Sequence, residues 1–154
     1  MAGVEVGDRA PAFTATLQDG STFDSAALIG RKWLVLFFYP KDGTPVCTRE
    51  ACAFRDSYEK FVAAGAEVVG VSSDSPASHA RFAARHRLTF PIISDGDRGL
   101  RKLFGVRNPL GFVPGRVTFV IDHQGIVRLV YAALFASDDH VARALAAVTG
   151  GPSP

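Results

Sequence analysis

The 154-residue chain has few of the residues and patterns that mark several classes of protein. The chain has only two cysteines, which in a reducing compartment favours catalytic or redox-active thiols over structural cross-links. The 17 Lys and Arg against 15 Asp and Glu, without a basic cluster, argue against a nucleic-acid partner. The apolar run at residues 33–39 is too short to span a bilayer. The first residues lack the basic and apolar regions of a signal peptide. These absences favour a cytoplasmic protein that does not bind membranes.

The composition is that of an ordinary globular protein. Apolar residues make up 47% of the chain and charged residues 21%, and the sequence has neither internal repeats nor low-complexity segments. At this length we expect one domain, covering residues 1–154, with a sizeable buried core.

Hydrophobic periodicity and turn residues predict an α/β fold. The apolar run at 33–39 indicates a strand buried on both faces, and segments 13–17 and 22–23 around Asp19-Gly20 predict an N-terminal hairpin. This order of elements predicts a central mixed β-sheet with helices on both faces. Further strands are expected at 67–72, 91–94, 116–121 and 126–131, and helices from 45 to near 65, from 75, from 97 to 104 and from 137.

The most informative segment is residues 37–52, in which a buried strand leads through a Pro/Gly turn to a cysteine. Thr44 is the expected N-cap and Pro45 the first helical residue, so Cys47 is the third. Unpaired amides and the positive end of the helix dipole favour a thiolate there. The Thr44 hydroxyl either caps the amide of residue 46 or 47 or donates to the thiolate or a bound substrate oxygen.

The second cysteine, Cys52, lies five residues after Cys47. Residues five apart in an α-helix have Cα atoms roughly 8–9 Å apart. A disulfide requires about 7 Å or less. Either Cys52 is idle, or the first helical turns unwind so that the two sulfurs can meet in a redox cycle.

The pattern Pro40-x-x-x-Thr44-x-x-Cys47 is similar to the active-site signature of the peroxiredoxins. Cys52 resembles the second cysteine of the Q-type subfamily, the bacterioferritin comigratory proteins. Val46 departs from the subfamily, which often has glycine there, and we expect this β-branched residue to slow unwinding of the Cys47 turn. The resemblance covers almost the whole chain, including residues 6–13, 19–20, 71–75, 78–82 and 116–122.

The resemblance implies a thioredoxin-like fold and a thiol-dependent peroxidase with neither a metal nor an organic cofactor. Cys47 matches the cysteine that attacks the hydroperoxide, and Cys52 matches the cysteine that resolves the product as a disulfide. Thioredoxin would be the usual reductant, and the protein would be a monomer.

The resemblance also assigns roles to nearby side chains. Thr44 would donate a hydrogen bond to the peroxide, Pro40 would shield the sulfur, and Arg116 would stabilise the thiolate and the transition state. Glu50 matches an acidic position that holds an arginine in place. By pattern alone Arg116 is a solvated charge at the start of a strand, so its role depends on the resemblance.

Two other functions remain open, a thioredoxin-fold disulfide oxidoreductase and a redox-sensing or chaperone-like binding module. The first class favours Cys-x-x-Cys, and neither cysteine here has a partner three residues away. The Gly- and Pro-rich loop at 107–114 is expected to line the pocket or an interface. All four histidines are expected at the surface: His79, His86, His123 and His140. His79 and His86 lie seven residues apart on one predicted helix, but no third ligand accompanies them, so a zinc site is not expected.

Overall fold

The structure, a computed structural model, describes residues 4–106, 115–133 and 137–150. The loop at 107–114, expected near the pocket or an interface, lies outside these residues. Among the described residues, no helix has both the length and the apolar character needed to cross a membrane. The elements, in chain order, are β1 (Thr14–Thr16), β2 (Thr22–Asp24), the short 3₁₀ helix η1 (Ser25–Leu28), β3 (Trp33–Phe38), α1 (Pro45–Ala63), β4 (Ala66–Ser72), α2 (Pro76–His86), β5 (Ile92–Ser94), α3 (Gly99–Phe104), β6 (Val117–Ile121), β7 (Val127–Ala132) and α4 (Ser137–Gly150).

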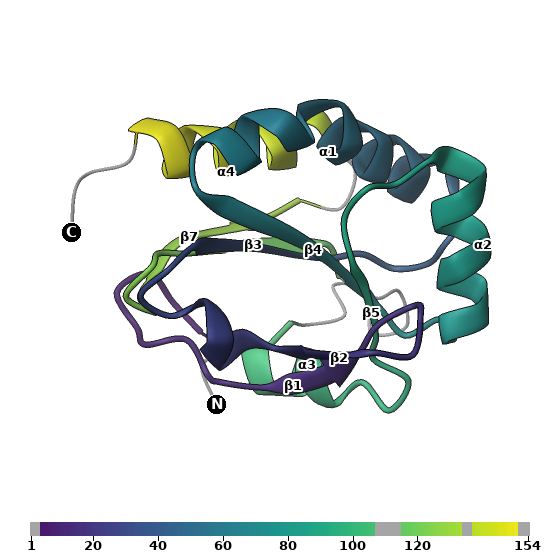
Figure 1. Cartoon of the computed structure of the whole chain (residues 1–154), viewed down its shortest axis with the longest axis horizontal. Coiled ribbons are helices and arrows are strands. Elements are labelled where there is room, and N and C mark those ends of the chain that lie inside the picture. The colour runs from purple at the N-terminus through teal and green to yellow at the C-terminus, as the bar shows by residue number, and fades with distance from the viewer. Residues whose placement is uncertain (1–3, 107–114, 134–136, 151–154) are drawn as a thin grey trace.

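The predicted mixed sheet is confirmed, with the strand order β5-β4-β3-β6-β7. β4 pairs in parallel with β3 and β5, while β6 pairs antiparallel with β3 and β7. The predicted N-terminal hairpin is also present, as a separate two-stranded sheet of β1 and β2. Helices α1 and α4 cover one face of the main sheet, and α3 and the hairpin cover the other (Figure 1).

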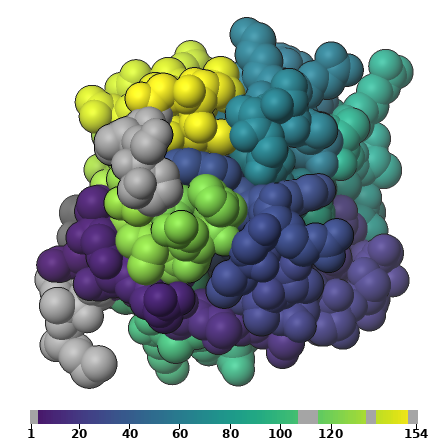
Figure 2. Space-filling model, turned by 60° about the vertical axis from the view of Figure 1, so that its left-hand side comes forward, coloured from purple at the N-terminus to yellow at the C-terminus, as the bar shows by residue number. Residues whose placement is uncertain are grey.

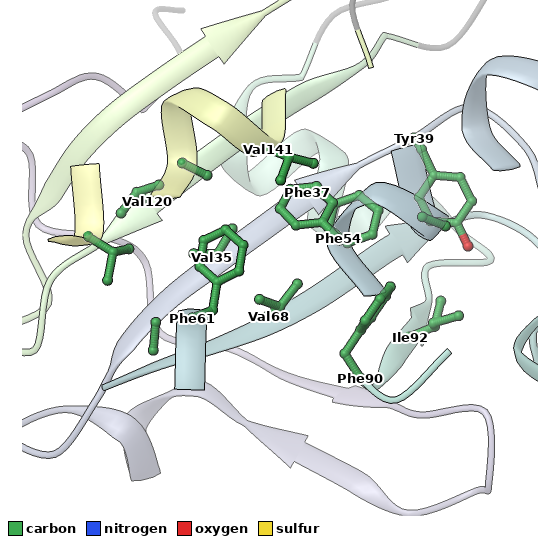
Figure 3. Packing of buried hydrophobic residues seen from close by; sticks show 14 of the residues in the cluster. Val35, Phe37, Tyr39, Phe54, Phe61, Val68, Phe90, Ile92, Val120 and Val141 are labelled. Carbon is green, nitrogen blue, oxygen red and sulfur yellow. The ribbon is translucent and has the colours of Figure 1, made fainter. Parts of the chain in front are cut away.

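The central strand β3 contributes to a hydrophobic core on each side of the sheet because its side chains alternate. Val35 and Phe37 pack in the core under α1 and α4 (Figure 3), where the Phe37 ring stacks on Phe54 with centroids 4.3 Å apart. Leu36 and Phe38 pack in the second core, toward α3 and the hairpin. Figure 2 shows α4 (yellow) beside the teal end of α1, consistent with their packing as a pair. This two-sided burial confirms the interpretation of the apolar run at 33–39.

Helix α3 starts two residues later than its predicted start at residue 97. Arg98 has left-handed backbone geometry (φ 59°), which ends the preceding turn rather than beginning a helix. The Asp95 carboxylate instead accepts hydrogen bonds from the amides of Leu100 (2.8 Å) and Arg101 (3.0 Å). The other predicted strands and helices are found with small shifts at their ends.

Candidate active site

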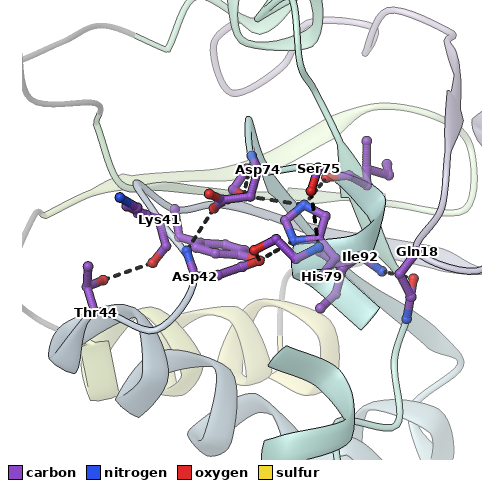
Figure 4. Close-up of polar contacts among 12 residues, drawn as sticks. Gln18, Lys41, Asp42, Thr44, Asp74, Ser75, His79 and Ile92 are labelled. Atoms are coloured by element: carbon purple, nitrogen blue, oxygen red, sulfur yellow. Dashed lines mark hydrogen bonds and ion pairs between the residues drawn. The ribbon is translucent and has the colours of Figure 1, made fainter. Parts of the chain in front are cut away.

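Cys47 lies in the first turn of α1, as predicted. Thr44 is the N-cap residue with extended backbone (φ −75°, ψ 151°), and its carbonyl accepts from the Thr48 amide at 2.8 Å. The Thr44 side chain makes no capping hydrogen bond, so of the two alternatives for its hydroxyl the capping one is not found, although Thr44 is the N-cap residue as predicted. Its hydroxyl donates instead to the Lys41 carbonyl at 2.9 Å (Figure 4) because the turn before the helix presents that acceptor to it.

Arg116 donates from Nη2 to the Cys47 sulfur at 3.0 Å. The sheet topology brings them together: β6 runs antiparallel to β3, so Val117 lies opposite Phe38, at the end of β3 that leads to α1. Arg116 is only 3% exposed, so the solvated charge indicated by its local pattern is wrong. A cation can be buried here because the sulfur and a carboxylate receive its hydrogen bonds.

The carboxylate beside Arg116 belongs to Glu50, on the buried face of α1. Glu50 is fully buried and its Oε1 accepts from Arg116 Nη1, in agreement with the arginine-holding role implied by the resemblance. Burial raises the pKa of Glu50 to about 7, against the opposing effect of the Arg116 charge. Cys47, Arg116 and Glu50 therefore form a buried chain of three ionisable groups.

A second buried arginine, Arg101, was missed by the sequence analysis. Its guanidinium donates to the carbonyls of Tyr39 (2.9 Å) and Gly115 (3.1 Å), which flank the site at the end of β3 and the start of β6. Burial lowers the pKa of Arg101 to about 10, although Asp95 acts in the opposite direction. The group remains a cation at neutral pH and adds positive charge near Cys47. An arginine in a six-residue helix gives no sequence signal of such burial.

The turn between β3 and α1 is held by a cluster of polar side chains around Asp42 (Figure 4). Asp42 accepts from Tyr39 Oη at 2.6 Å and Ser78 Oγ at 2.8 Å, and its Oδ2 lies 2.7 Å from His79 Nδ1. The Asp42 amide donates to Asp74 Oδ2 at 2.8 Å. Side chains from α2 and from the end of β4 therefore fix the turn that delivers Cys47.

The hydrogen bonds of His79 determine its charge. Nδ1 faces the Asp42 carboxylate, while Nε2 faces the Ile93 carbonyl at 3.1 Å and Ser72 Oγ at 3.3 Å. The Ser72 hydroxyl already donates its proton to Asp74, so every neighbour of the ring accepts. Both ring nitrogens therefore donate, and His79 is a buried cation paired with Asp42.

Burial alone would raise the pKa of Asp42, but the hydrogen bonds from His79 and Tyr39 and the His79 charge outweigh it, and the pKa is lowered. Asp42, Asp74 and His79 have ligand atoms within 4.8 Å of one another, a grouping that could hold a metal ion. The hydrogen bonds within this group account for its geometry without an ion.

Two of the four histidines contradict the expected surface position. His79 and His140 are fully buried, because hydrogen-bond partners from other elements satisfy their ring nitrogens. His140, on α4, contacts Thr118 Oγ1 and the Ala133 carbonyl, each at 2.7 Å. His86 and His123 are half-buried.

Cys52 is half-buried and Cys47 is buried, and both are free thiols. Helix α1 is continuous through both positions, so the geometric conflict noted from the sequence holds in the structure. A disulfide between them requires the first turns of α1 to unwind. Pro40 is half-buried in the segment that connects β3 to α1.

Comparison with known proteins identifies the family. The profile of the AhpC/TSA family matches residues 6–130. The chain is 48% identical over 142 residues to a chloroplastic peroxiredoxin Q of Populus jackii and 46% identical to one of Sedum lineare, covering 92% of this chain in each case. The match spans 66% of the Populus protein and 76% of the Sedum protein. The chain thus spans slightly less than two thirds of the Populus relative's length.

Solved structures agree with this result. Peroxidoxin BcpB of Mycobacterium tuberculosis superposes with a TM-score of 0.89 at 37% identity, covering 97% of this chain and 99% of that one. A mutant of Xanthomonas campestris peroxiredoxin Q superposes with a TM-score of 0.84 at 34% identity, covering 97% and 98%. The thioredoxin-like fold and the resemblance inferred from the motifs are confirmed, and the chain belongs to the AhpC/TSA family as a Q-type peroxiredoxin.

Proposed function

We propose that this protein is a thiol peroxidase that reduces hydrogen peroxide and organic hydroperoxides. The observation that carries the proposal is the 3.0 Å contact between Arg116 Nη2 and the buried Cys47 sulfur at the start of α1. A guanidinium and a helix N-terminus at one sulfur both favour the thiolate, which is the nucleophilic form. A related structure, of the Xanthomonas campestris bacterioferritin comigratory protein, concerns that protein's alkyl peroxide reduction activity.

In the proposed first step the Cys47 thiolate attacks one peroxide oxygen and the O–O bond breaks. The products are a Cys47 sulfenic acid and an alkoxide or hydroxide, which leaves as alcohol or water after taking up a proton. Arg116 would stabilise the developing negative charge. Thr44 would donate to the peroxide after its hydroxyl turns from the Lys41 carbonyl, and Pro40 would shield the sulfur.

In the proposed second step Cys52 resolves the sulfenic acid. The Cys52 thiolate attacks the Cys47 sulfur, a disulfide forms, and the hydroxyl group leaves as water. The continuous α1 helix must unwind first. A dithiol reductant of the thioredoxin type would then restore both thiols by thiol–disulfide exchange, leaving its own cysteines oxidised.

We further propose that the protein acts as a monomer in the cytoplasm. Among the described residues, the large exposed apolar side chains are spread along the chain rather than along one helix or strand: Val6, Ile29, Val62 and Leu103. A reducing compartment suits a cycle in which both cysteines return to thiols. The plant relatives are named as chloroplastic, so fractionation of the native cell is the test of this location.

Stopped-flow measurement of thiol loss tests the activity. Reduced protein mixed with one equivalent of hydrogen peroxide should lose both thiols orders of magnitude faster than free cysteine does. Cys47→Ser should abolish the fast reaction, whereas Cys52→Ser should lose one thiol at the same rate and accumulate a sulfenic acid. Slow thiol loss in the unaltered protein would refute the peroxidase and favour a disulfide oxidoreductase or a binding module.

A further inference from the structure

One oxygen of the buried Glu50 carboxyl has no hydrogen-bond partner among the described residues. This oxygen is Oε2, whereas Oε1 accepts from Arg116. His140 Nδ1 lies 3.6 Å from Oε2. An unpartnered buried carboxylate oxygen is costly, so this position requires a physical explanation.

The other contacts of His140 determine which of its nitrogens carries a proton. Nε2 lies 2.7 Å from the Ala133 carbonyl, which can only accept, so Nε2 donates. Nδ1 lies 2.7 Å from Thr118 Oγ1, whose hydroxyl can donate to it. In the neutral ring, Nδ1 and Glu50 Oε2 are then two acceptors facing each other with no proton between them. One proton, placed on either atom, removes this conflict.

The charged and titratable groups around His140 come from all the elements packed against it. Glu50 faces it from α1, Arg116 from the start of β6, Tyr131 from β7 and Asp139 from α4. Burial and the Arg116 charge lower the pKa of His140, while burial raises the pKa of Glu50 to about 7. These directions place the proton on the carboxyl rather than on the imidazole.

We propose that Glu50 and His140 together hold one exchangeable proton, and that this proton controls how strongly Arg116 acts on the Cys47 thiolate. With the proton bound, Glu50 is neutral, and the positive charge of Arg116 stabilises the Cys47 thiolate without competition from the Glu50 carboxyl. Without it, two anions compete for one guanidinium in a buried site, where charges interact strongly. His140 is thus a positioning residue for the proposed reaction, acting through Glu50 and Arg116.

Infrared spectroscopy of the reduced protein detects this proton directly, because a protonated carboxyl has a carbonyl band that a carboxylate lacks. We expect a band near pH 6 that disappears as the pH rises through about 7 and that is missing in Glu50→Gln. If the unaltered protein has no such Glu50-dependent band, the proposal is wrong, whatever the variants do.

Two substitutions of His140 should both move the loss of this band to lower pH, by different amounts. His140→Phe removes the acceptor that faces Oε2 and that can receive the carboxyl proton, so the carboxylate should form at lower pH than in the unaltered protein. His140→Asn removes the same acceptor and supplies an amide that can donate to Oε2, so its carboxylate should form at a still lower pH. His123→Asn, at the other end of β6 from Arg116, is the matched control and should leave the band unchanged. A purely structural role for His140 predicts no shift, and either no shift or a shift to higher pH overturns the proposal.

Alkylation of Cys47 measures the consequence at the sulfur without using peroxide. In a Cys52→Ser background at pH 6, His140→Asn should slow alkylation roughly three- to tenfold. The expected size follows because a shift of one pKa unit changes the population of a thiolate about tenfold. His140→Phe should slow alkylation by a smaller factor than His140→Asn does. The inference rests on the proposed peroxidase, but the two can fail separately. The two infrared shifts without fast peroxide reduction would refute the function alone, and fast reduction without the shifts would refute the proton site alone.

Discussion

The protein contains two buried ionic clusters close to the same turn, and they are built differently. In the Asp42–His79 cluster, both carboxylate oxygens of Asp42 and both ring nitrogens of His79 have hydrogen-bond partners, and each donor meets an acceptor. In the Glu50–Arg116 cluster, one carboxylate oxygen has no hydrogen-bond partner within the described part of the chain, and one guanidinium nitrogen donates to the Cys47 sulfur. The first cluster can hold a turn in place, while the second retains capacity to respond when charge at the sulfur changes.

This difference shows that burial of a charge does not by itself indicate a reactive group. When every hydrogen bond of a buried pair is formed, any change of protonation breaks one of them and destabilises the folded protein. Such a pair therefore serves to fix structure. A partly satisfied pair has a smaller penalty for gaining or losing a proton, so it can take part in chemistry. Stability should therefore depend mostly on the first cluster, and reactivity mostly on the second.

The largest effect is expected from breaking the satisfied cluster. His79→Gln leaves Asp42 as a buried charge without its cation and should lower the free energy of unfolding by about 3–5 kcal/mol in denaturant titrations. Asp56→Asn, in an exposed ion pair with Arg55, is the control and should change it by less than about 1 kcal/mol. If His79→Gln is as stable as the control, the buried ion pair does not hold the turn.

Reactivity should depend most on Arg116. Arg116→Lys keeps the charge but cannot reach Glu50 and Cys47 together with a planar fork, so the rate of reaction with hydrogen peroxide should fall roughly 10²–10³-fold. Stopped-flow thiol loss measures this rate. Arg128→Lys, which alters the half-exposed contact with Asp122, should react at the parent rate. A rate for Arg116→Lys within threefold of the parent would contradict the role of the guanidinium.

The two clusters should have opposite effects on stability as the pH changes. Glu50 has a pKa raised from 4.5 to about 7, so its contribution is present below 4.5 and is lost as the pH rises through about 7. The loss is on the order of 3 kcal/mol, and Glu50→Gln should remove this slope. The pKa of Asp42 is lowered, so its contribution is present above its unfolded value and is lost in acid. Unfolding free energies measured from pH 3 to 8 test both, and a slope unchanged in Glu50→Gln would contradict the assignment.

The smallest effect concerns unwinding of the first turn of α1. Val46→Gly should speed formation of the Cys47–Cys52 disulfide by up to about fivefold, because glycine weakens a helix by about 1 kcal/mol at most relative to good helix formers. Rapid quenching with a thiol reagent after peroxide addition measures this step. The preceding loss of the first thiol should be unaffected. Equal rates of disulfide formation in the two proteins would contradict a role for Val46.

Local sequence was sufficient for the start of the reactive helix. Thr44, Pro45 and Cys47 act through the backbone of one turn, so their placement could be predicted from residue type and spacing. The same is true of the buried β3 strand, whose apolar residues need no specific partner. Local sequence left two roles open for the Thr44 hydroxyl, and the capping bond does not form because a nearby carbonyl, set by the conformation of the turn, competes for the hydroxyl.

Buried polar residues were the ones that local sequence could not place. His79 meets Asp42 from 37 positions away, Arg116 meets Glu50 from 66, and Arg101 meets the Tyr39 carbonyl from 62. Each of these residues has the pattern of a surface residue within its own segment. The role of Arg116 was expected only through the family resemblance, and the burial of Arg101 and of two histidines was not expected at all.

By itself the sequence determined the order of helices and strands, the two-sided burial of β3 and a cysteine at a helix N-terminus, because these depend on periodicity and on neighbours within a few residues. Only the tertiary structure decided which charges are buried, which of them pair, and which oxygen of Glu50 is left facing His140. The physical reason is that burying a polar group is favourable only when partners from distant segments arrive with matching donors and acceptors.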